Sequence, residues 1–220
     1  MKYMEAYFSR FRSVWTHGDF ISFPPPLFRL HLHGRSDGVL NPSGVRFGSS
    51  EVYNILSTDP SVSPHILDAL LVGQRRKHDT NESLILFITP RAAALPPTQA
   101  RRLLLLPPAL ITAIQRSIGT SLSKRHIPTH IFSTPAPLPG APGMGDSGSW
   151  IPYTINGKKV EAPVKKIVCL GKRIVPSSTI ANPACLPWYE QFFHIEDVVA
   201  AGGPTTMTAL RDDGNRDSKL

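Results

Sequence analysis

The stretch Gly34-Arg35-Ser36-Asp37-Gly38-Val39-Leu40-Asn41-Pro42-Ser43-Gly44-Val45-Arg46-Phe47-Gly48-Ser49-Ser50-Glu51 carries more information about this chain than any other part of its sequence. Its glycines predict a short β-hairpin, because glycine permits the backbone angles of tight turns and the close approach of a ligand. Arg35 and Arg46 could together grip a phosphate and a ribose, since a guanidinium presents a planar fork of donors. Spacing alone favours the simpler interpretation, a solvated hairpin with surface charges.

The composition is that of a globular protein and sets bounds on its class. With 220 residues, 41% of them hydrophobic, the chain can hold one ordinary domain, or one small domain with extensions. No apolar run is long enough to span a bilayer, and the first residues lack the apolar core of a secretory signal. Cys169 and Cys185 lie outside any metal-binding spacing, so we expect buried free thiols and a cytosolic protein.

The formal net charge of +8 could indicate a nucleic acid, a membrane surface or a phosphorylated ligand as partner. The basic residues are scattered in pairs along the chain, and no nucleic-acid-binding motif accompanies them. We therefore expect solvated surface charge and phosphorylated small molecules rather than a nucleic acid partner. His126 and His130 stand four residues apart, but Pro128 between them breaks any helix, so no metal site is expected.

Apolar patterns after residue 50 predict a mixture of helices and strands. Residues 66–73 and 84–89 are apolar, β-compatible runs on either side of a polar turn, and we expect them to be adjacent strands of one sheet. A further strand is expected at 127–133, and helices at 50–57, at 107–119, towards the end of 161–168 and at 186–193. Irregular structure is expected at 21–33 around a proline run, in a flexible glycine- and proline-rich loop at 135–150, and in a disordered tail at 202–220.

The order of residues within 34–51 resembles the signature that joins the large and small domains of adenylate-forming acyl-CoA synthetases. The string from Arg35 to Ser49 looks like the acetoacetyl-CoA synthetases within that superfamily. Two further pieces agree in the expected order: Trp15-Thr16-His17-Gly18-Asp19 resembles the strand end before the hinge, and residues 151–161 resemble the lysine loop. The resemblance extends from about Tyr7 to about Phe193. It is interrupted at 21–33, where the family has a short hairpin, and at 135–150, where it has almost no insertion.

The resemblance implies an α+β fold: a small C-terminal lid domain, with a short sheet flanked by helices, preceded by a remnant of the large domain. The implied boundaries are 1–36 for the remnant, 37–175 for the lid domain with its flexible insertion at 135–150, and 176–220 for a short helix and the disordered tail.

A catalytic role for Lys158, in Asn156-Gly157-Lys158, is also implied by the resemblance. These enzymes first join a carboxylate to the α-phosphate of ATP and then transfer the acyl group to coenzyme A. A lysine on a mobile loop would neutralise charge at the α-phosphate and align the carboxylate with phosphorus. Without the resemblance, Lys158 and Lys159 would be interpreted as a solvated pair of surface lysines.

Other positions that match the family would bind the nucleotide and coenzyme A. Asp19 matches the ribose-binding aspartate, while Arg35 and Arg46 match groups that face the ribose and phosphates. Asp37 occupies the hinge position, about which the small domain would swing between two catalytic poses. The residues expected to contact coenzyme A are Ser43, Gly44 and Arg116, although Gln115 falls at the strictest alignment for the last of these.

The implied function is that of the C-terminal portion of an ATP-dependent acetoacetate–CoA ligase. Its substrates would be ATP, acetoacetate or a similar short acyl acid, and coenzyme A, with Mg²⁺ accompanying ATP but finding no ligand in this chain. The chain contains no phosphate-binding loop and no large domain for the acyl pocket, so we expect it to be incomplete alone and to need a separate N-terminal portion. The alternative is a non-catalytic stand-alone lid, or a truncated product with a binding or regulatory role.

Overall fold

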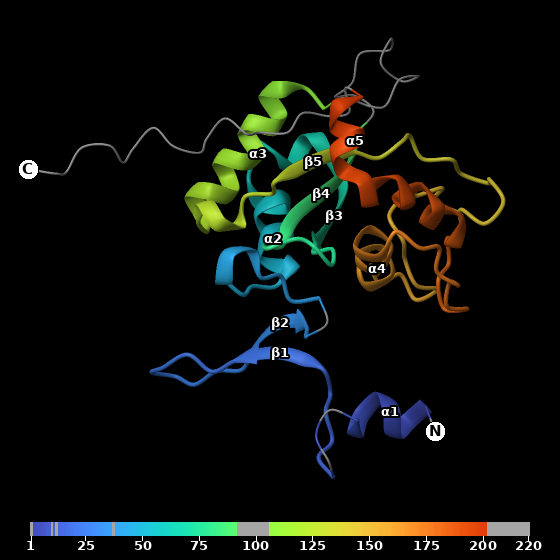
Figure 1. Cartoon of the computed structure of the whole chain (residues 1–220). Coiled ribbons are helices and arrows are strands. Elements are labelled where there is room, and N and C mark those ends of the chain that lie inside the picture. Colours follow the sequence, from blue (N-terminus) through green and yellow to red (C-terminus); the bar gives the residue numbers. More distant parts are fainter. Residues whose placement is uncertain (1, 10, 12, 37, 92–105, 202–220) are drawn as a thin grey trace, which may run out of the picture.

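A three-stranded sheet between two layers of helices forms the body of the molecule (Figure 1). The structure is a computed structural model that describes residues 2–9, 11, 13–36, 38–91 and 106–201. Strand β3 (Ile66–Gln74) pairs antiparallel with β4 (Ser83–Pro90), and β4 pairs parallel with β5 (His130–Ser133). The two predicted adjacent strands are therefore confirmed.

Both faces of this sheet are buried, which explains why its strands are continuous apolar runs rather than alternating ones. Leu71 and Leu86 contribute to one hydrophobic core, while their neighbours Leu70 and Phe87 contribute to the other. All four side chains have relative exposures of 0%. The period-two alternation of side chains thus divides one pair of strands between two cores.

Helices α2 (Ser49–Thr58) and α3 (Pro108–Ser121) supply the first core, and α4 (Ala162–Leu170) and the 3₁₀ segment η6 (Pro183–His194) supply the second. In Figure 1 the two pairs lie on opposite sides of the sheet. In the second core the ring of Phe87 lies 4.8–5.7 Å from aromatic rings of η6. Shorter elements complete the chain: α1 (Lys2–Phe8), β1 (Asp19–Ser22), β2 (His31–Arg35), η1 (Pro42–Gly44), η2 (Ser63–His65), η5 (Lys124–His126) and α5 (Ile195–Ala200).

These elements confirm the predicted helices at 50–57, at 107–119 and at the end of 161–168. The strand predicted at 127–133 is shorter, because η5 and Pro128 precede it and β5 begins at His130. The helix predicted at 186–193 is a 3₁₀ segment with Pro187 inside it, since proline cannot supply the N–H that an α-helix needs there.

Two local expectations were wrong. Residues 21–33 were expected to be irregular, but they belong to a hairpin. In it β1 and β2 pair antiparallel on either side of a proline-rich turn. The stretch 34–51 is not a hairpin with strands of its own. A single bridge, Leu40 to Phe47, closes around η1, where Ser43 and Gly44 adopt left-handed angles with φ of 51° and 87°. The stretch therefore works as a junction, which ends β2 and begins α2.

Residues 135–150, predicted to be a flexible insertion, form turns that are bonded to one another and packed against the body through Met144. Leu138 N–H donates to the carbonyl of Gly148 at 2.9 Å, and Trp150 Nε1 donates to the carbonyl of Ala136 at 3.0 Å. Met144 packs into the second core with 4% exposure. The flexibility of the insertion and the domain boundaries stay predictions, and the tail at 202–220 lies outside the described residues.

Cys185 is buried and Cys169 half-buried, and both are free thiols. Burial raises the pKa of the Cys185 thiol to about 12, so it stays protonated and inert at neutral pH. Among the helices that the structure describes, none is both long and apolar enough to cross a lipid bilayer.

His130, at the start of β5, is expected to make folding stability depend on pH. Burial lowers the pKa of its imidazole to about 4, an effect that the nearby Arg76 reinforces and Glu196 opposes. Its Nδ1 is buried without a hydrogen-bond partner in the described part of the chain. Below about pH 6.5 the imidazole of His130 is protonated in the unfolded chain but stays neutral in the folded chain. The free energy of unfolding therefore falls as the pH falls towards 4.

The gap between the two pKa values corresponds to about 3 kcal/mol at most, and partial exposure of the ring reduces the expected loss to about 2 kcal/mol. Urea unfolding of the chain at several pH values between about 7 and 4 measures this loss. The variant His130→Phe should lose most of the pH dependence in this range. An unchanged slope in that variant would assign the effect to other groups.

Candidate functional site

Lys158 lies exposed at the end of a tight turn that glycine makes possible. Gly157 adopts a φ of 72°, and its N–H donates to the carbonyl of Thr154 at 2.8 Å. The N–H of Lys158 donates to Thr154 Oγ1 at 3.0 Å, and its carbonyl accepts from the N–H of Thr154 at 2.8 Å. The backbone of the loop is thus fixed on Thr154, while the ammonium group of Lys158 is exposed to solvent.

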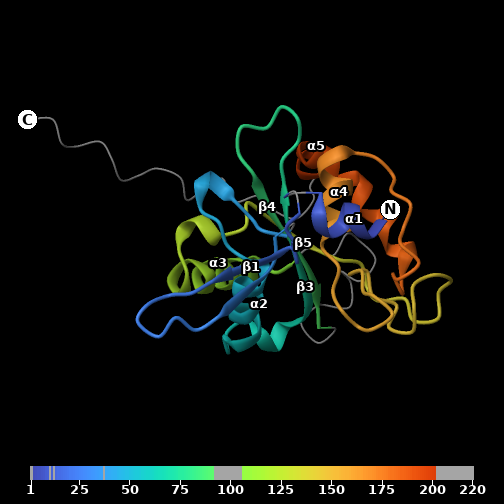
Figure 2. The same ribbon diagram turned by 90° about the horizontal axis from the view of Figure 1, so that it is seen from below.

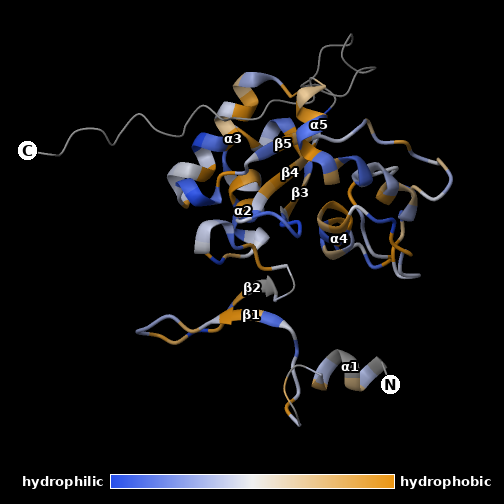
Figure 3. Cartoon of the chain, in the orientation of Figure 1, coloured by the Kyte–Doolittle hydropathy of each residue, from blue (hydrophilic) through white to orange (hydrophobic). Residues whose placement is uncertain are grey.

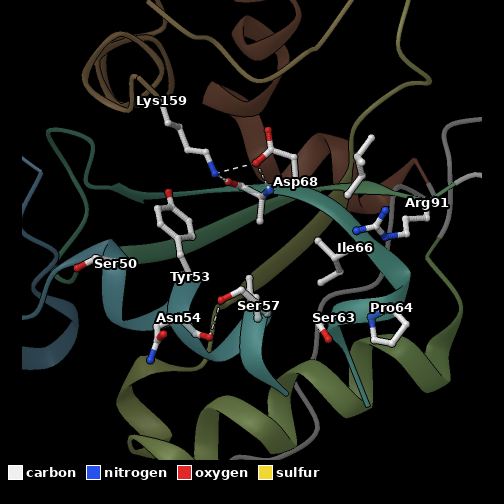
Figure 4. A pocket seen from close by; sticks show the side chains of 13 residues that line it. Ser50, Tyr53, Asn54, Ser57, Ser63, Pro64, Ile66, Asp68, Arg91 and Lys159 are labelled. Carbon is white, nitrogen blue, oxygen red and sulfur yellow. Dashed lines mark hydrogen bonds and ion pairs between the residues drawn. The ribbon is translucent and has the colours of Figure 1, made fainter. Parts of the chain in front are cut away.

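Lys159 behaves differently from its neighbour. Its Nζ forms an ion pair with Asp68 Oδ1 at 2.8 Å, donates to the carbonyl of Ala69, and lies 4.4 Å from the ring centre of Tyr53 (Figure 4). The side chains of Lys159 and Asp68 are only 23% and 19% exposed. The interpretation of Lys158 and Lys159 as a pair of solvated lysines is therefore wrong for Lys159.

A second set of polar contacts joins the residues after this loop to α2. Glu161 Oε1 accepts from Tyr53 Oη at 2.7 Å and from Ser49 Oγ at 2.5 Å, and Tyr53 Oη accepts from the N–H of Leu71 at 2.9 Å. Burial, and then the charge of Glu161, hold the pKa of Tyr53 well above its ordinary value. The phenol therefore stays protonated and can donate to the carboxylate.

A third set of contacts ties the junction stretch to α4. Glu82 Oε2 accepts from the backbone N–H of Asn41, and Glu82 Oε1 pairs with Lys165 Nζ at 3.1 Å. Lys165 Nζ also donates to the carbonyl of Val39 at 3.4 Å. The signature stretch at 34–51 and the lysine loop, more than 100 residues apart in sequence, are thus joined through α2, β3 and α4.

Two of the predicted nucleotide-binding residues, Asp19 and Arg35, lie on β1 and β2. Asp19 stands opposite Arg35 in the register of β1 and β2, and its carboxylate contacts Nδ1 of His17. The predicted hinge residue Asp37 lies outside the described residues, as does the side chain of Arg35.

The remaining predicted residues are exposed. Arg46, Ser43 and Gly44 lie on the turn at η1, where a Cβ at Gly44 would meet no atom within 4 Å. Glycine at that position therefore serves the backbone angle rather than a lack of space. On α3, Gln115 is buried with 6% exposure, whereas Arg116 is exposed, so Arg116 is the better placed of the two to meet a ligand.

In the described part of the chain, no hydrogen bond or ion pair joins Lys158, Arg46 and Arg116 to one another. The structure also brings together residues that sequence reasoning missed: Tyr53, Asp68, Lys159 and Glu161. For Lys159 and Glu161 the signal in the sequence was their place in the lysine loop, and Tyr53 and Asp68 carried none. No group of three potential metal ligands occurs among the residues described.

An open cleft of about 780 Å³ lies between α2 and the start of β3 (Figure 4). Tyr53, Asp68 and Lys159 line one part of it, and Arg91 lines another. Lys159, at the base of the lysine loop, therefore forms part of the wall of this cleft.

Comparison with known proteins places the chain beside CoA synthetases. It is 38% identical over 193 residues to malonamoyl-CoA synthetase vrtB of Penicillium aethiopicum, which covers 87% of this chain and 23% of that protein. It is 38% identical over 196 residues to acetoacetyl-CoA synthetase of Gallus gallus, which covers 89% of this chain and 25% of that protein. No family model matches the chain.

The solved structure of acetoacetyl-CoA synthetase from Streptomyces lividans superposes with a TM-score of 0.65 at 28% identity, covering 89% of this chain and 25% of that one. These findings confirm the predicted resemblance and the α+β fold. The chain spans about a quarter of the length of these relatives.

Proposed function

Because the chain is homologous over 89% of its length to a portion of acetoacetyl-CoA synthetases, we propose that it supplies the lid portion of an ATP-dependent acid–thiol ligase. The observation that carries the proposal is the position of Lys158. It is exposed on a glycine turn whose base is bonded to α2, the helix that begins at the end of the signature stretch. The substrates would be ATP, coenzyme A and acetoacetate or a similar short acyl acid, in a cytosolic enzyme.

The reaction proceeds in two half-reactions. A carboxylate oxygen attacks the α-phosphorus of ATP, the bond to pyrophosphate breaks, and an acyl-adenylate forms. The sulfur of coenzyme A then attacks the acyl carbon, and AMP leaves. In the first step Lys158 neutralises charge at the α-phosphate, while Asp19 accepts from ribose hydroxyls.

Arg35 and Arg46 would pair with phosphate oxygens, and Asp37 would be the hinge between the two half-reactions. Ser43, Gly44 and Arg116 would contact coenzyme A. The Mg²⁺ that accompanies ATP would be held by the nucleotide and by residues outside this chain.

The surface of residues 3–32 supports the proposal that this portion works against a larger one. Eleven large hydrophobic side chains there are more than 40% exposed. In Figures 1 and 3 the segment that carries α1, β1 and β2 lies below the body. Figure 2 shows β1 and β2 from below. Exposed apolar side chains gathered on one segment mark a surface for another protein part. They are Tyr3, Met4, Phe11, Val14, Trp15, Ile21, Phe23, Leu27, Phe28, Leu30 and Leu32.

A complementation assay tests the proposed function. The chain is assayed alone, and together with the part of the Gallus gallus acetoacetyl-CoA synthetase that it does not match, a mixture called here the complemented chain. Pyrophosphate release from ATP and acetoacetate is expected only from the complemented chain. Turnover by the chain alone would contradict the need for a second portion, and no release from either would favour the non-catalytic lid.

The apolar surface makes a separate prediction. Replacing Leu27 and Leu32, which are 67% and 65% exposed, by aspartate should weaken binding to the larger part by about tenfold or more. The melting temperature of the chain should stay the same, because neither side chain is buried. The matched control is Val175→Asp, at a residue 95% exposed elsewhere on the surface. Equal binding by all three proteins, measured by titration calorimetry, would place the interface elsewhere.

A further inference from the structure

We infer that Asp68 is a positioning residue for Lys158, acting through Lys159 and Tyr153, which it holds on the two arms of the lysine loop. This inference rests on the proposed function of Lys158. It assigns a role to a residue of β3, outside every motif that the sequence singles out.

The geometry of the carboxylate carries the inference. Asp68 Oδ1 pairs with Lys159 Nζ at 2.8 Å, and Asp68 Oδ2 accepts from Tyr153 Oη at 2.6 Å. Tyr153 and Lys159 face each other in an antiparallel bridge, one just before the turn and one just after Lys158. One side chain of the rigid sheet therefore fixes both ends of the turn (Figure 4 shows the Lys159 arm).

The surroundings of the Asp68 carboxylate strengthen its contacts with Lys159 and Tyr153. Asp68 is 19% and Lys159 23% exposed, so the ion pair is screened less than a surface pair. The ammonium group also meets the carbonyl of Ala69 and the ring of Tyr53. Burial, and then the hydrogen bond to Asp68, raise the pKa of Tyr153, which therefore stays a donor to the carboxylate.

The consequence for Lys158 follows from the length of its side chain. A lysine has many rotamers, so only its backbone position can be set in advance by the fold. A shift of about 1 Å in a positioned group can cost about 100-fold in rate. Loss of the anchor should therefore slow the step in which Lys158 acts, without removing the fold or the substrate contacts of other residues.

The first experiment measures hydrogen exchange of the backbone in the 220-residue chain, and needs no activity. In Asp68→Asn and Lys159→Met, the amides of Gly157 and Lys158 should exchange about tenfold faster than in the unmodified chain, while β4 keeps its protection. Lys159→Arg keeps a cation for Asp68 and Tyr53 and should restore protection. The matched control is Lys166→Met, at an exposed lysine on α4.

The second experiment measures pyrophosphate release by the complemented chain. In Asp68→Asn and Lys159→Met, kcat should fall by about 10- to 50-fold with KM for ATP within about threefold. Thioester formation from preformed acyl-adenylate should stay within about threefold. Exchange within about twofold of the unmodified chain, or a loss of protection that extends equally over β4, would overturn the inference. Absence of activity in the unmodified complemented chain would contradict the proposed function instead, and exchange would still decide the anchoring.

Discussion

Replacing Lys158 by alanine is expected to reduce pyrophosphate release by the complemented chain by about 100-fold or more. The physical reason is that a single preorganised charge aimed at the reacting phosphate contributes about 10²–10³ to kcat. The melting temperature should not change, because the side chain is exposed and the loop contacts of this residue are made by its backbone. KM for ATP should change little, since Lys158 acts mainly on the transition state.

Two further variants provide the controls for this prediction. Lys166→Ala removes an exposed lysine from α4 and should leave the rate unchanged within about twofold. Lys158→Arg keeps the charge but moves it, and should recover only part of the rate. A Lys158→Ala chain that releases pyrophosphate within about threefold of the unmodified rate would remove the residue from the proposed mechanism.

Replacing Glu82 by alanine is expected to lower the free energy of unfolding by about 1–3 kcal/mol, because it removes one partner of a half-buried ion pair. The Glu82 side chain is 9% exposed and that of its partner Lys165 is 26% exposed. The variant also leaves the backbone N–H of Asn41 without its acceptor. Urea unfolding measures the loss. Glu190→Ala is the matched control, because that carboxylate lies 4.0 Å from Arg173 with exposures of 40% and 79%, and its loss should cost about 0.5 kcal/mol or less.

Gly73 offers a second route to the same interaction. A Cβ at this position would overlap the carboxylate of Glu82, so Gly73→Ala should displace that side chain from Asn41 and Lys165. In the Glu82→Ala background the three atoms nearest to this Cβ are absent, and Gly73→Ala should cost much less. The two losses should therefore be strongly non-additive in a double-mutant cycle. Additive losses would show that the two positions act independently.

Much of the body could be predicted because its signals are local. The apolar runs of β3 and β4 and the spacing of apolar residues in α2 and α3 are visible in any short window of sequence. The hairpin of β1 and β2 could not be predicted in this way, because its strands pair across a proline run that interrupts the strand pattern. The 3₁₀ geometry of η6 was missed for a similar reason: Leu186 and Phe192 show the apolar face of a helix but not the pitch of its hydrogen bonds.

The same division applies to the candidate site. Residue order alone was enough to relate this chain to the acyl-CoA synthetases and to single out Lys158. A motif is a linear pattern, so it can be recognised without knowing the distances between residues. Which charges are free and which are paired could emerge only from the folded chain. Lys158 and Lys159 are adjacent and alike in sequence, yet one is exposed and the other is held by Asp68, 91 residues earlier. Burial and pairing depend on distances between residues far apart in the chain, and those distances exist only once the sheet and its helices have packed together.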